Sequence, residues 1–520
     1  MKEEKNGLYN EKIECKIKYD NADSCLFKYN TLKESLKNQK MKSIPYRISI
    51  LKKLLEIWDK YESLINKSNF IDLGQSEIIS SMYSFALIRK EITFAIDNLK
   101  NWVKPIKCDT PLFIGYAYSY VIPEPFGLTL IFSAWNCNFL TLIVPLVQAI
   151  AAGNLCLCKP ASMSPETCKV CMMILNELPN DVVQCCAGKS EVYTQLLQLR
   201  YDLIIFTGSS TKGKIIAQAA AKFLTPTILE LGGQNPVIVD KTANIELAAK
   251  NILFGRHVFD GQACIAAEYI MCDRTIYSKF VAEIQKRVVE FYGEKPVTSQ
   301  FLGRIINEMH YDRIYKLCTD PGDGAKILYG DLTQCDKGTK FIPPMLFGFE
   351  SLEIMGKSEL SKGEIFGPVL YIAPYDKIED AVQYINEREK PLSAYLFTSD
   401  SQIKQYVRDK TSSGSLDIND TVYHFSNCYL PFGGVGNSGM GAYHGKWGFQ
   451  HMSHWKPILD QSQLIMNIKY PPYDGFKSKF LKTILIKFNY GRNQLINWFI
   501  YFIISIILIV YGIKMKNKYN

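Results

Sequence analysis

One cysteine, Cys264, lies in the segment D-G-Q-A-C-I at residues 260–265. An apolar helical run precedes this segment, and a strand-like run from Tyr269 to Cys272 follows it. We therefore expect a loop in which a substrate can reach the thiol, whereas most of the other cysteines lie inside apolar runs. As a thiolate, such a cysteine is a nucleophile that can form a covalent intermediate with a carbonyl compound.

A glutamate upstream, Glu230, supplies a second reactive group. It lies in L-E-L-G-G at residues 229–233, between two leucines and before a turn of two glycines. Apolar neighbours raise the pKa of a carboxyl group, which can then take a proton from water near neutral pH. A thiol nucleophile and such a base are the two groups needed to form a thioester and to hydrolyse it. Considered alone, Glu230 also fits a structural carboxylate at the end of a strand.

The pattern of apolar residues predicts the elements that position these groups. Residues 31–103 are helical in pattern, and from Leu128 onward short apolar runs alternate with longer helical runs. The expected strands of this first block are 128–132, 155–158, 182–186 and 203–206, separated by helices at 139–152, 166–177 and 191–198. A second block runs from near Thr227 to about Asp420, with strands expected at 236–239, 269–272, 368–372 and 394–397. The glycine-rich run at 431–441 should then break all regular structure.

Strand–helix–strand repeats of this kind predict a parallel sheet with helices on both faces. Ligands of such sheets bind beyond the carboxyl ends of the strands. Asn136, Lys159 and Gly208 all fall at or just after expected strand ends. We therefore expect these three residues to converge on one crevice.

Composition and charge limit the class of protein. With 520 residues, 47% of them hydrophobic and 21% charged, the chain is long enough for a large core and for more than one domain. Residues 471–520 contain eight lysines and arginines against one aspartate, so they hold +7 of the net charge of +9 and leave +2 for the rest. A nucleic-acid-binding protein would need a basic face on its body, so we expect no nucleic-acid partner.

The cysteines and histidines carry no metal-site pattern. The fifteen cysteines are scattered and odd in number, and the polar N-terminus has no apolar run of a signal peptide. We therefore expect reduced thiols of a cytosolic domain. Cys168 and Cys171 form a C-x-x-C on an expected helix, which we interpret as a buried helix face. His451 and His454 have no glutamate nearby, so we expect no metal.

The C-terminal tail has two parts. Residues 493–513 contain no charged residue and are rich in isoleucine, and a helix of that length would be roughly 31 Å long, close to the hydrocarbon thickness of a bilayer. Before it, Phe476 to Tyr490 alternates lysines with apolar residues, as a basic amphipathic helix at an anionic membrane does. We expect a transmembrane helix at 493–513. A helix lying flat in the interface and a buried core helix are the alternatives.

Nine short strings occur in a fixed order along the body of the chain. They are P-F-G (125–127), A-W-N (134–136), K-P (159–160), F-T-G-S (206–209), L-T-P-T-I-L-E-L-G-G (224–233), G-Q-A-C-I-A (261–266), E-I-F-G-P (364–368), I-N-E-R-E-K-P-L (385–392) and P-F-G-G-V-G-N-S-G-M-G-A-Y-H-G-K (431–446). Each is weak alone, but the ordered set covers about residues 30–475. It resembles the aldehyde dehydrogenase superfamily, most closely the class 3 branch and within it the membrane-anchored fatty aldehyde dehydrogenases.

This resemblance implies an α/β fold with a Rossmann-like NAD(P)-binding domain, an α/β catalytic domain and a β-hairpin arm for oligomerisation. The arm would comprise Phe113 to Ile122 and residues after Asp420. The expected parts are a polar N-terminal extension (1–30), the NAD(P)-binding domain (31–230, interrupted by an arm strand at 108–124), the catalytic thiol domain (231–420), an oligomerisation segment (421–470), a basic amphipathic segment (471–492) and the transmembrane anchor (493–513).

The resemblance also assigns roles to residues. Cys264 would be the nucleophile, Glu230 the base that activates water, and the Asn136 amide with the Cys264 backbone N–H the donors to the oxyanion. NAD or NADP would be the cofactor. Lys159 would bind the adenosine ribose, Glu364 the nicotinamide ribose, and Phe366 would pack near the nicotinamide ring. The further cofactor-binding residues would be Ser162, Gly208, Ser209, Gly213 and Leu231, with the pyrophosphate facing the helix expected at 214–223.

Three departures from the family pattern involve four residues. Cys137 and Asn138 follow A-W-N where tyrosine and proline are usual, so the tyrosine's part in the substrate funnel is lost. Ser162 stands where many relatives have a glutamate that holds the ribose diol, and serine does not repel a 2′-phosphate. Gly363 replaces the glutamate that class 3 relatives usually carry before Glu364, with no clear consequence.

The expected activity is the NAD(P)-dependent oxidation of medium- or long-chain aliphatic aldehydes to acids by a homodimer. The body would lie on the cytoplasmic face of a membrane, most plausibly the endoplasmic reticulum. Two alternatives remain at this point: a CoA-acylating dehydrogenase, against which Glu230 argues, and a non-catalytic membrane scaffold, against which the intact set of Cys264, Glu230 and Asn136 argues.

Overall fold

The computed structural model describes residues 12–15, 18–111, 114, 117–463, 469–487, 499 and 503. The described chain divides into two compact units. Unit 1 comprises residues up to 99 and residues 125–452, and it contains Cys264 and Glu230. Unit 2 comprises residues 100–124 and the residues after 452.

A six-stranded sheet in unit 1 contains the strands expected from the first block. Its order is β15-β7-β6-β3-β4-β5, and all neighbours are parallel except β15 and β7. The strands are β3 (Leu128–Phe132), β4 (Leu155–Lys159), β5 (Val183–Cys185), β6 (Leu203–Gly208), β7 (Thr227–Leu231) and β15 (Gly439–Met440). Their register aligns Phe132 with Lys159 and Gly208 with Leu231, so these strands end at the same edge of the sheet, and the convergence of Asn136, Lys159 and Gly208 on one crevice stays a prediction.

Two expectations for this region are wrong. The second block was expected to begin near Thr227, but β7 pairs with β6 and so completes the first sheet, before the turn at Gly232 and Gly233. The run 431–441 was expected to contain no regular structure, yet Gly439 and Met440 pair with Glu230 and Leu229. Gly439 has φ 149° and a Cβ there would collide with the Leu229 carbonyl, so only glycine permits this approach.

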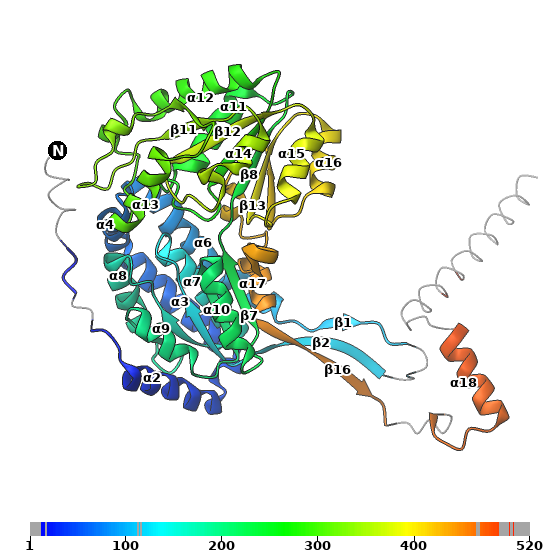
Figure 1. The fold of residues 1–520 in the computed structure, drawn as a ribbon. Helices are drawn as coiled ribbons and strands as arrows, with labels where there is room; N and C mark the ends of the chain where they lie inside the picture. Colours follow the sequence, from blue (N-terminus) through cyan, green and yellow to red (C-terminus); the bar gives the residue numbers. More distant parts are fainter. Residues whose placement is uncertain are drawn as a thin grey trace, which may run out of the picture. The chain divides into compact units, whose positions relative to one another are not determined.

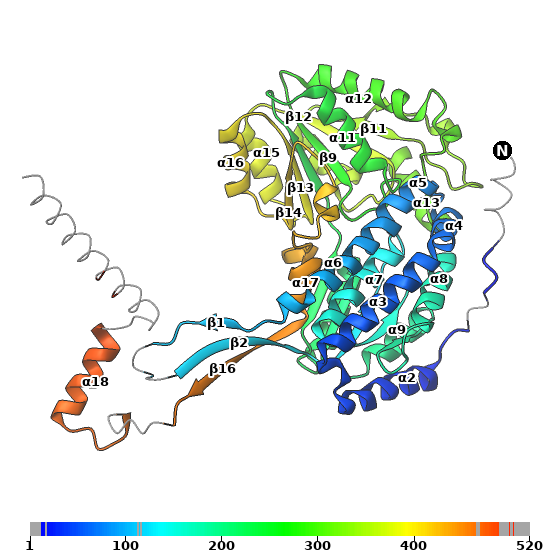
Figure 2. The ribbon, with the colours of Figure 1, turned by 180° about the vertical axis from the view of Figure 1, so that it is seen from behind.

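Helices cover the faces of this sheet (Figures 1 and 2). They are α2 (Ala22–Ser35), α3 (Ile44–Lys60), α4 (Glu62–Leu73), α6 (Leu87–Trp102), α7 (Asn138–Ala152), α8 (Pro165–Asn176), α9 (Ser190–Leu197) and α10 (Ser210–Ala221). Every residue of α7 is buried, since α3, α8 and α17 (Gly445–His451) all pack against it. The helix ends at Gly153, whose φ of 97° suits a left-handed cap, as the sequence predicts. Cys168 and Cys171 lie fully buried on α8, which confirms their place on a buried helix face.

A seven-stranded sheet forms the core of the second block. Its order is β10-β11-β12-β9-β8-β13-β14, with only β10 antiparallel to its neighbour. The strands are β8 (Asn235–Val239), β9 (Ala267–Asp273), β10 (Lys326–Tyr329), β11 (Met345–Gly348), β12 (Val369–Tyr375), β13 (Ser393–Phe397) and β14 (Ser415–Ile418). Alternate residues of β9 enter two different cores: Ile270 packs with α11 (Ile245–His257) and α12 (Tyr277–Tyr292), and Met271 with α13 (Glu308–Thr319). Both faces are therefore covered, as predicted for a parallel sheet.

Residues 22–30 of the expected polar extension (1–30) form part of a packed helix. Helix α2 begins at Ala22 and buries Cys25, Tyr29 and Leu32 on one face. Tyr29 donates its hydroxyl proton to the Arg200 carbonyl at 2.7 Å, and Lys28 donates to the Cys185 carbonyl at 2.7 Å. The described residues between 20 and 30 therefore belong to the packed body of unit 1.

Unit 2 contains a three-stranded sheet of order β1-β2-β16 and one described helix of the tail. The strands are β1 (Ile106–Cys108), β2 (Ala117–Pro125) and β16 (Ser453–Gln461), and β1 pairs antiparallel with β2. The tail helix, α18 (Gly475–Lys487), carries exposed Phe476 and Leu485 beside its lysines. In the part of the chain that the structure describes, no helix has both the length and the apolar character needed to cross a bilayer. The predicted span 493–513 lies outside the described residues except at 499 and 503.

Candidate active site

Cys264 lies in a turn between α11 and β9, as the sequence predicts. From residue 260 to residue 273 every residue is buried except Cys264, which is partly exposed. The turn begins at Asp260 and Gly261, which both have positive φ, and a Cβ at Gly261 would collide with the Gly367 carbonyl. The thiol is therefore the one group that this loop presents at its surface.

Side-chain amides hold the loop in place. Asn235, the first residue of β8, donates through Nδ2 to the carbonyls of Cys264 at 2.8 Å and Ala266 at 3.0 Å. Gln262 donates to the Arg304 carbonyl at 3.0 Å and accepts from the Ile306 N–H at 3.0 Å. These bonds fix the loop at both ends, which limits the positions that the thiol can take.

The Cys264 thiol is neutral in this setting. Burial raises its pKa well above the usual value, and the neighbouring Cys137, Glu364 and Glu230 raise it further, while its own backbone N–H opposes them. A base must therefore take the thiol proton when the cysteine attacks a substrate.

Glu230 lies near the carboxyl end of β7 and is 2% exposed. Neither carboxylate oxygen has a hydrogen-bond partner among the described residues. Burial consequently raises its pKa well above the usual value, as the flanking leucines predict. A buried carboxyl group without partners is unusual in a structural role, because nothing compensates for its desolvation. The same property suits a general base.

Asn136 follows β3 and is buried against the thiol loop. Its Nδ2 donates to the Gln262 carbonyl at 2.9 Å, which brings Cys137 and Cys264 to the same part of the site. Since an amide NH₂ carries two protons, one N–H remains for a substrate oxygen. The structure thus brings Asn136 and Cys264 together.

Glu364 and Phe366 lie in the loop before β12. The Glu364 carboxylate accepts a hydrogen bond from the Gly233 backbone N–H, and burial raises its pKa to about 8. A Cβ at Gly232 would collide with this carboxylate, so the L-E-L-G-G turn leaves room for it. Among the described residues Glu364 Oε1 has no partner, and an unpaired buried acceptor of this kind fits a ribose hydroxyl. Phe366 packs edge-on against Trp135, with ring centroids 5.4 Å apart.

The expected phosphate-facing residues lie together where β6 turns into α10. Ser209 caps α10 by accepting from the Lys212 N–H at 3.4 Å, and it is exposed, while Gly208 is partly exposed. Gly213 packs against Leu231, and a Cβ at that glycine would collide with the leucine side chain. The helix N-terminus at this edge of the sheet can face an anion.

Lys159 takes a conformation that the sequence does not predict. Its side chain is fully buried, its Nζ donates to the Pro160 carbonyl at 2.9 Å, and the ammonium lies 4.2 Å from the Tyr193 ring centroid. Burial lowers its pKa to about 8. In this conformation the ammonium points into the protein, and its assignment to a ribose stays a prediction. Ser162, in the turn that follows, is partly exposed.

Sequence reasoning missed an aromatic cluster beside the thiol loop, made of Tyr83, Phe254, Phe259 and Tyr423. The Tyr83 ring lies 6.0 Å from both phenylalanine rings, and Phe254 stacks on Tyr423 at 5.9 Å. The two tyrosine hydroxyls are 3.3 Å apart. Phe254 and Phe259 were visible as apolar residues just before Cys264, but no spacing pointed to tyrosines from a π-helix (Ser81–Ala86) and from a 3₁₀ turn (Tyr423–Ser426).

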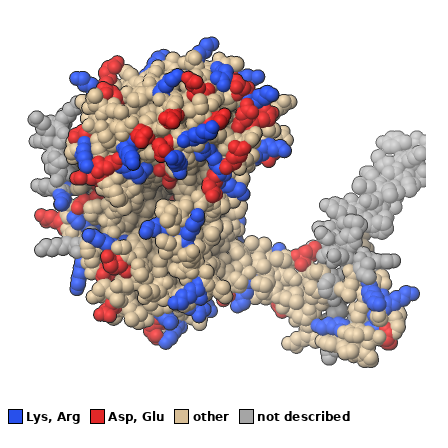
Figure 3. All heavy atoms as spheres, viewed as in Figure 1, with Lys and Arg blue, Asp and Glu red and all other residues tan. Residues whose placement is uncertain are grey.

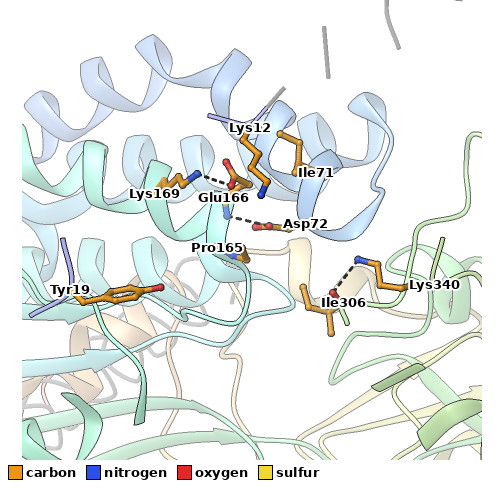
Figure 4. Close-up of a pocket in the computed structure, with 9 residues that line it drawn as sticks. All are labelled: Lys12, Tyr19, Ile71, Asp72, Pro165, Glu166, Lys169, Ile306 and Lys340. Atoms are coloured by element: carbon orange, nitrogen blue, oxygen red, sulfur yellow. Dashed lines mark hydrogen bonds and ion pairs between the residues drawn. The ribbon is translucent and has the colours of Figure 1, made fainter. Parts of the chain in front are cut away.

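A separate cavity of about 450 Å³ lies at the start of α8 (Figure 4). Three lysines line it (Lys12, Lys169 and Lys340). The two acids in its wall are already paired, because Asp72 accepts from the Thr167 N–H at 2.7 Å and Glu166 pairs with Lys169 at 2.7 Å. None of the predicted site residues lines this cavity.

On the face in Figure 3, lysines and arginines are interspersed with acids over unit 1.

Comparison with known proteins places this site in a family. The sequence model of the Aldehyde dehydrogenase family matches residues 9–458. Aldehyde dehydrogenase family 3 member A2 of Rattus norvegicus is 37% identical over 470 residues, which are 89% of this chain and 95% of that protein. The 4,4'-diaponeurosporen-aldehyde dehydrogenase of Staphylococcus aureus is 37% identical over 458 residues, covering 88% of this chain and 98% of that protein.

A solved structure agrees with the sequence comparison. The substrate-bound state of Staphylococcus aureus AldH superposes with a TM-score of 0.84 at 36% identity, covering 88% of this chain and 98% of that one. Both the thiol loop and the buried carboxylate lie inside the matched length. The chain therefore belongs to the aldehyde dehydrogenase family, enzymes that use NAD or NADP, and resembles its family 3 members over most of its length.

Proposed function

We propose that the protein oxidises aliphatic aldehydes of medium to long chain to carboxylic acids, with NAD or NADP, through a thiohemiacetal and a thioester on Cys264. The observation that carries this proposal is that two groups act in one site. Cys264 is the only accessible residue of the loop at 260–266, and the buried carboxyl group of Glu230, which affects the Cys264 pKa, has no hydrogen-bond partner among the described residues. One group can attack a carbonyl carbon, and the other can activate the water that releases the acid.

The first step is attack by the Cys264 sulfur on the aldehyde carbon. Because the thiol is neutral at rest, its proton passes to a base, for which ionised Glu230 is available, and leaves Glu230 for solvent before the second half of the reaction. The carbonyl oxygen becomes negative and accepts hydrogen bonds from the free Asn136 N–H and the Cys264 backbone N–H. One such donor typically contributes about 3 kcal/mol to the stability of the transition state.

The second half of the reaction oxidises the bound carbon and frees the product. When bound, the oxidised nicotinamide supplies the acceptor for the hydride that leaves this carbon. Glu364 would hold the nicotinamide ribose and Phe366 would face the ring. The Glu364 Oε1 atom, which has no hydrogen-bond partner among the described residues, supports the role of Glu364. Glu230 then takes a proton from water, and the resulting hydroxide attacks the thioester and releases the acid and the Cys264 thiol.

The substrate class is proposed from the aromatic cluster. Tyr83, Phe254, Phe259 and Tyr423 form a partly exposed apolar surface beside the loop that carries the nucleophile. Such a surface binds an alkyl chain by removing it from water, at about 0.8 kcal/mol per buried CH₂ group. Cys137 in place of the bulkier tyrosine leaves more room near the thiol. The Staphylococcus aureus relative is named as a 4,4'-diaponeurosporen-aldehyde dehydrogenase, and an aldehyde substrate for that relative agrees with this proposal.

We also propose that the enzyme works as a homodimer attached to a membrane. The β1-β2-β16 sheet of unit 2 would serve as the oligomerisation arm. Residues 493–513 would be the anchor, with α18 on the membrane surface and the body in the cytoplasm, at the endoplasmic reticulum. The exposed phenylalanines and lysines of α18 support contact with an anionic bilayer.

A series of aldehydes of increasing chain length, assayed with NAD and with NADP on the full chain, tests the activity. We expect catalytic efficiency, kcat/KM, to rise with chain length and acid to form without CoA. Oxidation that needs CoA would favour the CoA-acylating alternative. No cofactor reduction with any aldehyde would favour the scaffold.

Replacing Ser162 with glutamate should shift the cofactor preference toward NAD. A carboxylate in the turn after Lys159 would repel a 2′-phosphate, so kcat/KM with NADP should fall roughly tenfold relative to NAD. The measurement is the ratio of kcat/KM for the two cofactors with one aldehyde.

Ser162→Gln is the matched control, because it adds the same bulk without charge and should leave the ratio near that of the native enzyme. Native protein that already rejects NADP more than about a hundredfold would contradict the role given to Ser162.

A chain that ends at Tyr473 should be soluble and still oxidise short aldehydes. Its kcat/KM should fall mainly for long aldehydes, because they concentrate in a bilayer that the shortened chain no longer reaches. The measurement is kcat/KM for short and long aldehydes, determined for the full chain and for the chain that ends at Tyr473 in the presence of vesicles.

Alkaline carbonate extraction of membranes that contain the full chain is the companion test. The protein should stay in the pellet. Its release into the supernatant would mean that the tail lies on the surface, contrary to the proposed anchor.

A further inference from the structure

The backbone of Ile365, which lies between the two proposed cofactor residues, is held through both its N–H and its carbonyl. Its N–H donates to Glu268 Oε1 at 2.6 Å, and its carbonyl accepts from Arg313 Nη2 at 2.7 Å. Glu268 comes from β9, four residues after Cys264, and Arg313 comes from α13. Ile365 itself is fully buried. We call Glu268 and Arg313 the Ile365 clamp.

The carboxylate side of the clamp is itself anchored. Glu268 Oε2 pairs with Arg256 Nη1 at 2.7 Å, and the same Arg256 nitrogen donates to the Ala267 carbonyl at 2.9 Å. Glu268 is 2% exposed and Arg256 is fully buried. A buried ion pair of this kind contributes little net stability, because desolvation offsets the attraction. The arrangement is therefore better explained by the geometry that it imposes.

The loop needs such support because its backbone is strained. Phe366 has φ 55°, a left-handed conformation that is unfavourable for an aromatic residue. Strained residues persist where their surroundings fix them, and the Ile365 clamp acts on the peptide directly before Phe366. On the N-terminal side of Ile365, the carboxylate of Glu364 fills the space beside Gly232.

Helix α13 also reaches the ring that faces Phe366. His310, one turn before Arg313, lies 5.3 Å from the Trp135 ring, and Trp135 in turn contacts Phe366 at 5.4 Å. Helix α13 thus contacts the Phe366 loop in two ways. Arg313 binds the backbone of the loop, and His310 contacts Trp135, which packs against the Phe366 ring. A shift of α13 would move both contacts together.

We propose that Glu268 and Arg313 are positioning residues for the cofactor: by clamping the Ile365 peptide they set the Glu364 carboxylate and the Phe366 ring in their binding geometry. This inference rests on the proposed roles of those two residues. It also joins the strand that follows the nucleophile to the cofactor loop, since Glu268 belongs to the same strand-and-loop segment as Cys264.

Replacement of Arg313 tests the clamp. Arg313→Met removes the donor to the Ile365 carbonyl, and Arg313→Lys retains a donor and a charge. We expect the dissociation constants for NAD and NADP to rise roughly tenfold in the methionine variant and to be partly restored in the lysine variant. Titration of protein tryptophan fluorescence with each cofactor measures these constants. Arg408→Met, on an exposed helix, is the matched control.

Two measurements separate positioning from a general structural role. Alkylation of Cys264 by iodoacetamide needs no cofactor. Its rate in Arg313→Met should differ less than twofold from that of the native protein, which is small beside a tenfold loss of cofactor affinity. Thermal unfolding should show a folded protein. Glu268→Gln should also raise the dissociation constants for NAD and NADP. If this variant does not fold, the comparison of Arg313→Met with Arg313→Lys alone tests the clamp.

The outcomes are distinct. Unchanged cofactor affinity in Arg313→Met overturns the clamp, and so does an equal loss of affinity and of thiol reactivity, which indicates a structural role only. If the native protein binds neither cofactor, the proposed function fails as well, and the clamp falls with it. If the native protein binds NAD or NADP and Arg313→Met binds it more weakly, both the proposed function and the Ile365 clamp are supported.

Discussion

Replacing Cys264 with serine or alanine should abolish aldehyde oxidation, by roughly 10³-fold or more, while cofactor affinity stays near that of the native enzyme. The loop at 260–266 presents no other group at its surface, so either substitution leaves this loop without a nucleophile. The measurements are steady-state cofactor reduction and a direct cofactor titration on the same variant.

Two further cysteine variants make this result interpretable. Cys108→Ser changes an exposed cysteine of unit 2 and should leave activity intact. Cys137→Ser tests the other partly exposed thiol of the site. Loss of activity in Cys137→Ser together with substantial turnover in Cys264→Ser would move the nucleophile to Cys137.

The second large effect is expected for Glu230→Gln. Glutamine preserves the shape of the side chain but cannot take a proton from water, so hydrolysis of the thioester should slow by roughly 10²- to 10⁴-fold. Oxidation precedes hydrolysis, so one burst of reduced cofactor, close to one per active site, should appear before turnover stops. Rapid-mixing absorbance measurements detect it.

The pH dependence gives an independent check of the same residue. Since burial raises the Glu230 pKa above its usual value, the carboxyl group stays protonated, and inactive as a base, up to a higher pH than an exposed glutamate does. The hydrolysis rate of the native enzyme should therefore rise with pH as this group ionises, and the rise should be absent in Glu230→Gln. Glu379→Gln, at an exposed position of a distant helix, is the control. If the burst is lost as well, Glu230 acts earlier, on the thiol.

The parts of the fold that the sequence predicts well are those whose burial is uniform. β3 and β4 are fully buried and consist of apolar residues apart from Thr129 and Lys159, and α7 ends at the glycine that the pattern indicates. Elements with weak signals were missed. β15 has only two residues, one of them glycine, and its partner strand lies far away in the chain, so no local pattern could reveal it.

A similar distinction holds for the site. Cys264 and Glu230 were predictable because a loop cysteine between apolar runs and a carboxyl group between leucines are local features. The conformation of Lys159 was not, because it depends on Tyr193 from another helix. The Ile365 clamp was equally hidden. It joins β9, α13 and the loop before β12, and the type of residue at Glu268 or Arg313 does not indicate a backbone partner.

The pairing of Gly439 with Glu230 has a consequence for how the enzyme is made. While the chain is being synthesised, β3, β4, β6 and β7 emerge early and can form a sheet, but the edge of β7 that carries Glu230 remains uncovered. That edge is closed only when residues near 440 leave the ribosome, shortly before the tail follows. A nascent chain therefore completes the surroundings of its base only after β8 to β14 have been made, and shorter nascent chains would expose a strand edge that a chaperone can bind.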